Sequence, residues 1–349
     1  MASLTEVSYQ TRNIIKYGSL ALIIIVAGKI LLDLTISVWK KLHPPPPPPP
    51  TVSFGKIPSL EFPLSKFEGW FQYNLETPTG KLPDLGDRAT VYFMPAARPN
   101  LLALDKSKEE ANLMGFNSEP ESIAPKIYQW TKQDPVPSTL EMDIFSGSFV
   151  LDYNWNSDPN ILIEKNLPGK EQVKFESQNF LQRTGLLEED LVNGKIEVEY
   201  LRVAGNDFVP VMSLSEANFV KAEIFRTDIN NIPILTPDPK KGVVSIIFSG
   251  SNNAQKRIIK VEFNYYPIKY DSLATYPIKT TATAFEELKA GQGFVASFKG
   301  EGRNITIRRV YLAYYDADKM QKFMQPIIVF EGDNDFFAYV MAVTQDWTL

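Results

Sequence analysis

The sequence predicts an α+β protein in which one N-terminal transmembrane helix and a polyproline stalk carry a β-rich domain of antiparallel meanders with short helices. Three observations support this prediction: an apolar run near the N-terminus, seven consecutive prolines behind it, and short strand-like segments interrupted by a few helical ones. We expect a tail at 1–16, a transmembrane signal-anchor helix at 17–39, a stalk and extended arm at 40–65, a first α+β module at 66–170, and one or more β-rich α+β modules at 171–349.

The composition favours a folded domain and argues against a nucleic-acid partner. Of the 349 residues, 44% are hydrophobic and 12% are aromatic, which is enough to build a hydrophobic core. The formal net charge is only -5, so no strongly basic surface is expected to neutralise phosphates. We therefore expect a globular domain that binds no nucleic acid.

The residue types exclude most catalytic chemistry. The chain has no cysteine, which removes disulfides, thiolate nucleophiles and thiolate metal sites. Its single histidine, His43, lies in the stalk, so the domain has none for a Ser-His pair or a zinc site. We expect no catalytic residue, cofactor or metal. An enzyme that uses only carboxylates is the alternative, although "LEED" at 187–190 is typical of a solvated surface.

The apolar run "YGSLALIIIVAGKILLDLTISVW" at 17–39 predicts the membrane helix. With a rise of ~1.5 Å per residue, it would cross a hydrocarbon layer of ~30 Å. No small-residue cleavage site follows it, so we interpret it as an uncleaved signal anchor. Basic residues flank both ends, Arg12 and Lys16 before it and Lys40 and Lys41 after it, and they do not decide the orientation.

Two charged residues lie inside this run. Lys29 and Asp33 are four residues apart, so a helix places them on one face. A charge at the centre of a membrane helix costs ~2.5–3.5 kcal/mol on insertion scales, which predicts a partner for each. The two side chains either neutralise each other or form a docking face for another membrane helix, and the sequence leaves both interpretations open.

Behind the helix, the prolines at 44–50 predict a spacer. A polyproline II rod rises ~3.1 Å per residue, which gives a semi-rigid stalk of roughly 20 Å. Recognition by an SH3 or WW domain is the alternative function of such a run. The following segment "TVSFGKIPSLEFPLS", at 51–65, predicts an extended arm that lies on the domain.

The domain itself is predicted to consist of about twelve short strands, identified by alternating apolar residues and by β-branched or aromatic residues. Two pairs form hairpins, one through Ser146 and Gly147 and one through "EGDND" at 331–335. Helices are predicted at 105–116, 176–187, 213–222 and 280–293. The strands are predicted at 89–95, 126–132, 139–145, 148–155, 195–203, 219–227, 242–250, 258–268, 293–302, 304–316, 325–332 and 336–347.

Acidic residues in two turns suggest a cation as an alternative to a structural role. Glu331, Asp333 and Asp335 offer oxygen ligands of the kind that Ca²⁺ takes, but the other positions of a calcium loop are missing. Asp316 and Asp318 follow a predicted strand in the same way. A turn at 331–335 and a strand end at 316 are the favoured interpretations.

Two aromatic clusters are candidate interaction surfaces. The first lies in "GWFQY" and the second in "NYYPIKY". Packing of alternate strand residues into the core is the simpler interpretation, and a strip that binds a glycan or a protein is the functional one. The six residues are Trp70, Phe71, Tyr73, Tyr265, Tyr266 and Tyr270.

A family resemblance concerns the C-terminal part of the chain. There, "YPIKTTATAFEELKAGQGFV" (276–295) precedes "ITIRRVYLAYYD" (305–316) and "MQPIIVFEGDNDFFAYVMAV" (324–343). This order of helix, strand and hairpin resembles the extracytoplasmic, PepSY-like domains of YycH/YycI-type membrane-anchored regulators of a Gram-positive sensor kinase. The resemblance implies a non-enzymatic, outward-facing domain whose anchor helix contacts a kinase or another membrane partner. It assigns no site residue.

Together these observations predict a single-pass protein of the bacterial cell membrane with most of its chain outside the cytoplasm. We expect a regulatory or scaffolding role in which the chain contacts the lipid bilayer and a membrane or envelope protein, and oligomerisation is compatible with this role. The alternative is a structural or adhesive component of a larger envelope assembly.

Overall fold

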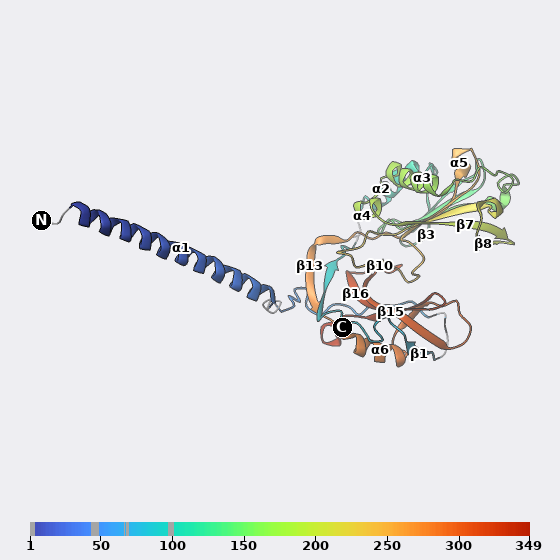
Figure 1. Ribbon diagram of the computed structural model, residues 1–349. Helices are drawn as coiled ribbons and strands as arrows, with labels where there is room; N and C mark the ends of the chain where they lie inside the picture. Colours follow the sequence, from blue (N-terminus) through green and yellow to red (C-terminus); the bar gives the residue numbers. More distant parts are fainter. Residues whose placement is uncertain (1–3, 43–48, 66, 68–69, 97–100) are drawn as a thin grey trace. The chain divides into compact units, whose positions relative to one another are not determined.

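The computed structural model describes residues 4–42, 49–65, 67, 70–96 and 101–349 (Figure 1). Contacts divide the chain between Pro49 and Pro50 into an N-terminal unit and a large second unit. Most of the proline run and His43 lie outside the described residues, so the polyproline stalk remains a prediction.

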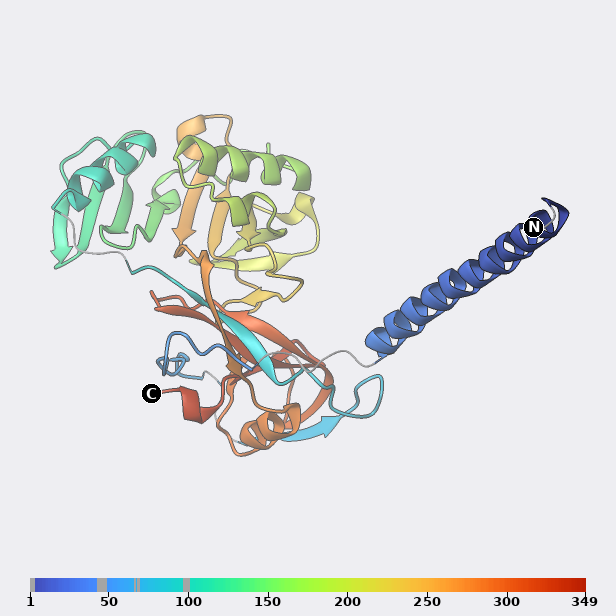
Figure 2. The same cartoon turned by 90° about the vertical axis from the view of Figure 1, so that its left-hand side faces the viewer.

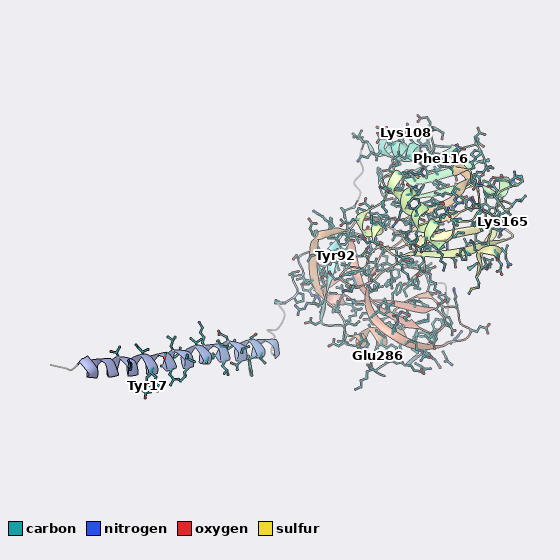
Figure 3. The ribbon with its side chains drawn as sticks, turned by 45° about the horizontal axis from the view of Figure 1, so that its top comes forward. Tyr17, Tyr92, Lys108, Phe116, Lys165 and Glu286 are labelled. Carbon is teal, nitrogen blue, oxygen red and sulfur yellow. The ribbon has the colours of Figure 1, made fainter. Side chains whose placement is uncertain are left out.

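The N-terminal unit contains one long helix, α1 (Leu4–Leu42). Its stretch Ile15–Trp39 has a mean hydropathy of 2.2, and its apolar side chains are exposed, as is the aromatic ring of Tyr17 (Figure 3). The 25 residues of this stretch extend for ~37 Å at ~1.5 Å per residue. The chain therefore has one N-terminal helix that is long and apolar enough to cross a membrane.

The second unit is β-rich and contains two sheets. The larger has nine strands in the order β3-β4-β5-β6-β12-β11-β9-β7-β8, and all its neighbours are antiparallel. Its strands are β3 (Glu121–Ala124), β4 (Ile127–Lys132), β5 (Ser138–Asp143), β6 (Phe149–Tyr153), β7 (Ile196–Ala204), β8 (Asp207–Val211), β9 (Phe219–Ile224), β11 (Val244–Phe248) and β12 (Ile258–Phe263).

Two helices, α2 (Ala103–Leu113) and α3 (Lys170–Arg183), pack on one face of the nine-stranded sheet (Figure 1). Leu181 of α3 and Phe116, labelled in Figure 3, are buried there with Trp130 of β4. The short helices α4 (Glu189–Val192) and α5 (Ala254–Arg257) belong to the same part of the chain. Burial of this apolar face is the main force that holds helices and sheet together.

The second sheet is mixed. Its central strands are antiparallel, whereas β1 and β10 run parallel to β15. β2, the cyan arrow in Figure 2, pairs with both β13 and β16. The helix α6 (Thr281–Lys289) covers one face. The strands are β1 (Gln72–Leu75), β2 (Arg88–Phe93), β10 (Ile234–Leu235), β13 (Lys269–Pro277), β14 (Phe294–Ser297), β15 (Asn304–Tyr315), β16 (Phe323–Gly332) and β17 (Phe336–Met341).

Strand pairing crosses the module boundary expected at residue 170. β6 pairs with β12, more than 100 residues later in the chain, and β2 pairs with β13. Both sheets therefore contain strands from each expected module, and the contacts group residues 50–349 as one unit. The architecture is α+β, with antiparallel pairing predominant.

Local predictions differ from the structure in two helices. The helix expected at 213–222 is wrong, because the chain forms a short 3-10 turn at Leu214–Glu216 and then enters β9. Residues 219 to 224 contact other parts of the domain on both faces of the sheet, so the apolar residues give no alternation that distinguishes strand from helix. The helix expected at 176–187 begins earlier, since α3 starts at Lys170.

Both predicted hairpins are present. Gly147 adopts a φ of 74° between β5 and β6, a conformation that glycine tolerates without steric cost. Between β16 and β17, Asn334 and Asp335 have φ values of 56° and 55°, as the left-handed residues of a tight hairpin require.

The arm at 51–65 is attached to the second unit at several points. The N–H of Val52 donates to the carbonyl of Thr275, and the Tyr276 hydroxyl donates to the carbonyl of Gly55. Further on, Ile57 forms a parallel bridge with Thr348. The start of the second unit is thus held by both β13 and the last residues of the chain.

Candidate functional site

A pocket of about 370 Å³ lies beside the arm. We call it the arm pocket. One wall consists of arm residues 58–63. The other, which we call the 315–323 wall, consists of Tyr315 and residues 317–323, where β15 ends and β16 begins. Pro237 and Gln325 complete the lining. A pocket of this size with prolines and aromatic rings in its walls can hold an apolar side chain or a small ligand.

Aromatic packing fixes the arm wall of the pocket. The ring of Phe62 stacks on Phe294 with centroids 5.3 Å apart, and it meets the ring of Tyr315 edge-on at 4.9 Å. Such pairs add stabilisation beyond the area they bury. Gln325 donates a hydrogen bond of 2.8 Å from Nε2 to the carbonyl of Pro58, so the arm is held by a polar contact as well.

The opposite wall contains an unpaired hydroxyl. Gln321 donates from Nε2 to the carbonyl of Tyr315 at 2.7 Å, which closes the connection between the two strands. The Tyr315 hydroxyl is buried and has no hydrogen-bond partner in the described structure. Burial raises the pKa of this phenol above its ordinary value, so it is a neutral donor at physiological pH.

Next to this wall, a buried guanidinium joins the two sheets. Arg226, just after β9, donates from Nη1 to Asp190 and from Nε to Asp316, each at 2.6 Å. Its Nη2 donates to the carbonyl of Tyr266, also at 2.6 Å. The side chain of Arg226 is fully buried, and Asp316 directly follows Tyr315 of the pocket wall. Asp316 itself does not line the pocket, so the pocket and the buried junction of Arg226, Asp190 and Asp316 are separate features that share one strand end.

The junction contains two carboxyl groups and one guanidinium. Asp190 uses both oxygens, since it also accepts from the hydroxyls of Tyr265 and Tyr270. In contrast, Oδ1 of Asp316 is buried and has no partner in the described structure. Burial raises the pKa of Asp316 above its ordinary value, and the charge of Arg226 opposes this rise.

The second predicted aromatic cluster belongs to this junction and not to an exposed strip. Tyr265 and Tyr266 are buried, and the guanidinium of Arg226 lies 4.0 Å from the centroid of the Tyr265 ring. Only Tyr270 is substantially exposed, at 43%. The phenols hold charged groups inside the domain, so their role here is structural.

The first cluster is divided. Phe71 and Tyr73 pack around Phe336, and burial raises the pKa of Tyr73 to about 12. Trp70 is 69% exposed and lies against the turn at Gly291. A second cavity of about 120 Å³ lies among these residues. Trp70 is thus the member of this cluster whose ring is open to a ligand.

Lys29 and Asp33 lie on α1 with exposed side chains. Within the described part of the chain they form no ion pair with each other, so the structure does not show the self-neutralising pair. Their role as a docking face for a second membrane helix remains a prediction.

Each acid of the 331–335 turn has a basic partner. Glu331 pairs with Arg309, Asp333 with Arg308 at 2.7 Å, and Asp335 with Lys240 at 2.5 Å. Among the described residues, no group of three acids or histidines has a geometry suited to a metal ion. These pairs agree with the turn interpretation. Asp316, which directly follows β15, forms an ion pair with Arg226.

Sequence reasoning did not identify Arg226 as a central residue. A single arginine after a strand carries no local signal, because its partners lie 36 and 90 residues away in the chain. The arm pocket was missed for the same reason, although its arm wall was expected to lie on the domain.

Comparison with known proteins gives limited information. No protein-family model and no curated protein matches the chain. Among solved structures, it is similar to an uncharacterized protein from Eubacterium rectale ATCC 33656, with a TM-score of 0.34 and 11% sequence identity over 74% of this chain and 82% of that one. A likeness this weak supports no argument about function, so the function must be inferred from the residues themselves.

Proposed function

We propose that this chain is a non-enzymatic, single-pass membrane protein whose β-rich domain lies outside the cytoplasm and binds a protein partner at the cell envelope. The role is regulatory or scaffolding. The YycH/YycI resemblance and its PepSY-like modules belong to this proposal, with a sensor kinase or another membrane protein as the partner of α1.

One observation carries the proposal. The wall of the arm pocket at 58–63 begins only eight residues after the proline run, in the segment that follows the run directly. A partner bound in the pocket would contact the segment that continues toward the anchor. The domain thus offers a contact site on the very piece of chain that ties it to the membrane, as a coupling or scaffolding subunit requires.

The absence of cysteine from the sequence allows a direct test of topology. Lys299→Cys places one thiol on the surface of the domain, and Ser8→Cys places one before the apolar stretch. In intact cells, a membrane-impermeant maleimide should label the first variant and should label the second only after lysis. Labelling in the reverse order would place the domain in the cytoplasm and refute the proposal.

The docking face of α1 is tested separately. Lys29→Leu combined with Asp33→Leu should remove membrane proteins that co-purify with the chain, because leucines offer no polar contact to a neighbouring helix. Thr35→Leu is a matched control, since Thr35 lies away from this face and its hydroxyl donates to the carbonyl of Leu32 in the same helix. Unchanged co-purification in the double variant would exclude this face.

A further inference from the structure

Beside the pocket, the arm has an exposed apolar side chain and backbone groups that form no hydrogen bond. Leu64, one residue beyond the pocket wall, is 96% exposed. Within the described chain, the backbone N–H and C=O groups of Glu61 and Phe62 form no hydrogen bond. Because Phe62 precedes a proline, its backbone favours an extended conformation. Residues 61–62 of the arm are therefore an unpaired extended stretch next to the arm pocket, a combination that accepts another extended chain.

We propose that the arm pocket is occupied by the arm of a second copy of this chain, with Leu64 of the second copy inserted between the arm wall and the 315–323 wall. The two arms run antiparallel about a twofold axis. This arrangement requires one surface that carries both the inserted side chain and the receiving pocket. Leu64 and the arm pocket meet this requirement, because they are adjacent on the same arm.

The charges at the pocket agree with self-association. The lining contains two acids, Glu61 and Asp318, and two bases, Lys319 and Lys322. Within the described residues none of the four belongs to an ion pair. A twofold axis brings each set opposite its copy, so acids can meet bases across the interface without a net charge. A partner of strongly acidic or basic character is less well matched to this balance.

Membrane anchoring favours the same occupant. Copies that share one membrane are confined to the same layer, which raises their effective concentration and allows a modest contact to form. The proposal depends on the proposed function only for this confinement. The contact itself is a property of the domain and is measured without reference to topology.

The test uses full-length chain in detergent micelles or lipid nanodiscs. A chain with Leu64→Cys and one affinity tag is mixed with a chain that carries Met320→Cys, in the opposite pocket wall, and a different tag. Mild oxidation should yield a disulfide between differently tagged chains. The matched control replaces the second chain by Lys299→Cys, an exposed position outside the pocket lining, which should cross-link far less. Equal yields in both mixtures would overturn the proposal.

A second measurement does not depend on cysteine chemistry. Leu64→Asp should weaken self-association at least ~tenfold by sedimentation, because the variant loses the apolar contact with the rings and prolines of the pocket and must desolvate a carboxylate there. Since Leu64 is exposed, the thermal unfolding midpoint of the variant should equal that of the parent chain, which shows that the fold is intact. A monomeric parent chain under these conditions, or a variant that associates as well as the parent, would refute the occupant proposed here. Neither result would alter the maleimide labelling.

Discussion

Arg226 shows how one residue organises this domain. Its guanidinium uses three nitrogens on two carboxylates and a backbone carbonyl in a place that solvent does not reach. A buried ion pair often adds little net stability compared with apolar side chains, but loss of one partner leaves uncompensated charge. The contribution of Arg226 to stability is therefore best judged from what its removal exposes.

Arg226→Met should destabilise the domain by about 3–5 kcal/mol, because Asp190 and Asp316 would remain buried without their counter-charge. Urea unfolding followed by tryptophan fluorescence would measure the loss. Arg309→Met is the control, since Arg309 pairs with Glu331 at the surface and such pairs contribute ~0–1 kcal/mol. Similar losses in the two variants would show that the junction has no special role.

Asp316 gives the junction a pH dependence. Its pKa in the folded chain is raised above the value of ~3.9 for an unfolded aspartate, so the folded state holds this proton to higher pH than the unfolded state does. The stabilising contribution of protonated Asp316 is complete below pH ~4 and is lost as the pH rises through the folded pKa. Asp316→Asn, which cannot ionise, should gain stability relative to the parent chain as the pH rises from 4 toward 7.

The pH dependence of stability should have the opposite sign in Asp335→Asn. The hydrogen bond from Lys240 lowers the pKa of Asp335, so its ionised form contributes stability above the unfolded pKa that is lost in acid. This variant should lose stability relative to the parent chain as the pH rises from about 2 to about 4, and the difference should change little above that pH. Unfolding free energies at about pH 2.5, 4.5 and 7 compare both variants. Parallel pH dependence of Asp316→Asn and the parent chain would contradict the assignment.

At the scale of elements, the arm is a single extended segment held by aromatic packing and by bonds to both β13 and the last residues of the chain. Its position was predicted in outline from scattered prolines and alternating apolar residues. The residues that hold the arm in place could not be predicted, because they are tertiary contacts: Phe294 and Tyr315, the ring partners of Phe62, lie more than 200 residues away in the chain.

Phe62→Ala should release the arm from its wall at a cost of about 2 kcal/mol, since two ring contacts and part of the buried area are lost. The expected result is faster proteolysis within residues 51–65, with cleavage sites read by mass spectrometry. Leu64→Ala is the matched control, because its side chain is already exposed and its loss removes no contact within the chain. Equal cleavage rates in the two variants would show that the ring does not hold the arm.

The hairpins and most strands were also predictable at this scale. Turn residues with left-handed backbone and period-two burial are local signals, and β5–β6 carries both. The β16–β17 hairpin carries the turn signal alone, because nearly every residue of β16 is buried. The failure at 213–222 has the opposite origin. Central strand β9 is covered on both faces, so its apolar pattern contains no period that separates strand from helix.

At the scale of the whole molecule, residues 50–349 fold as one unit because the sheets combine distant parts of the chain. The edge that β6 offers is completed by β12, and β2 is completed by β13 and β16. The boundary expected at residue 170 therefore does not separate the two sheets.

A fragment of the chain tests whether residues 66–170 can fold without these partners. A fragment of residues 66–170 contains β6 and β2 but lacks β12, β13 and β16, so it should show no cooperative unfolding and no protected amides in hydrogen exchange. Residues 50–349 should unfold cooperatively under the same conditions. A fragment with a sharp unfolding transition would establish 66–170 as an independent module, as the sequence pattern suggested.

The sequence by itself determined the features that depend on near neighbours. A continuous apolar run is sufficient for a helix of membrane-spanning length, alternation is sufficient for most strands, and glycine or asparagine at a turn is sufficient for a hairpin. Only the tertiary structure decided which strands share a sheet, that Tyr265 and Tyr266 surround a buried arginine, and that the arm forms one wall of a pocket. Those outcomes depend on pairing between residues tens to hundreds of positions apart, and local periodicity does not encode the choice of a distant partner.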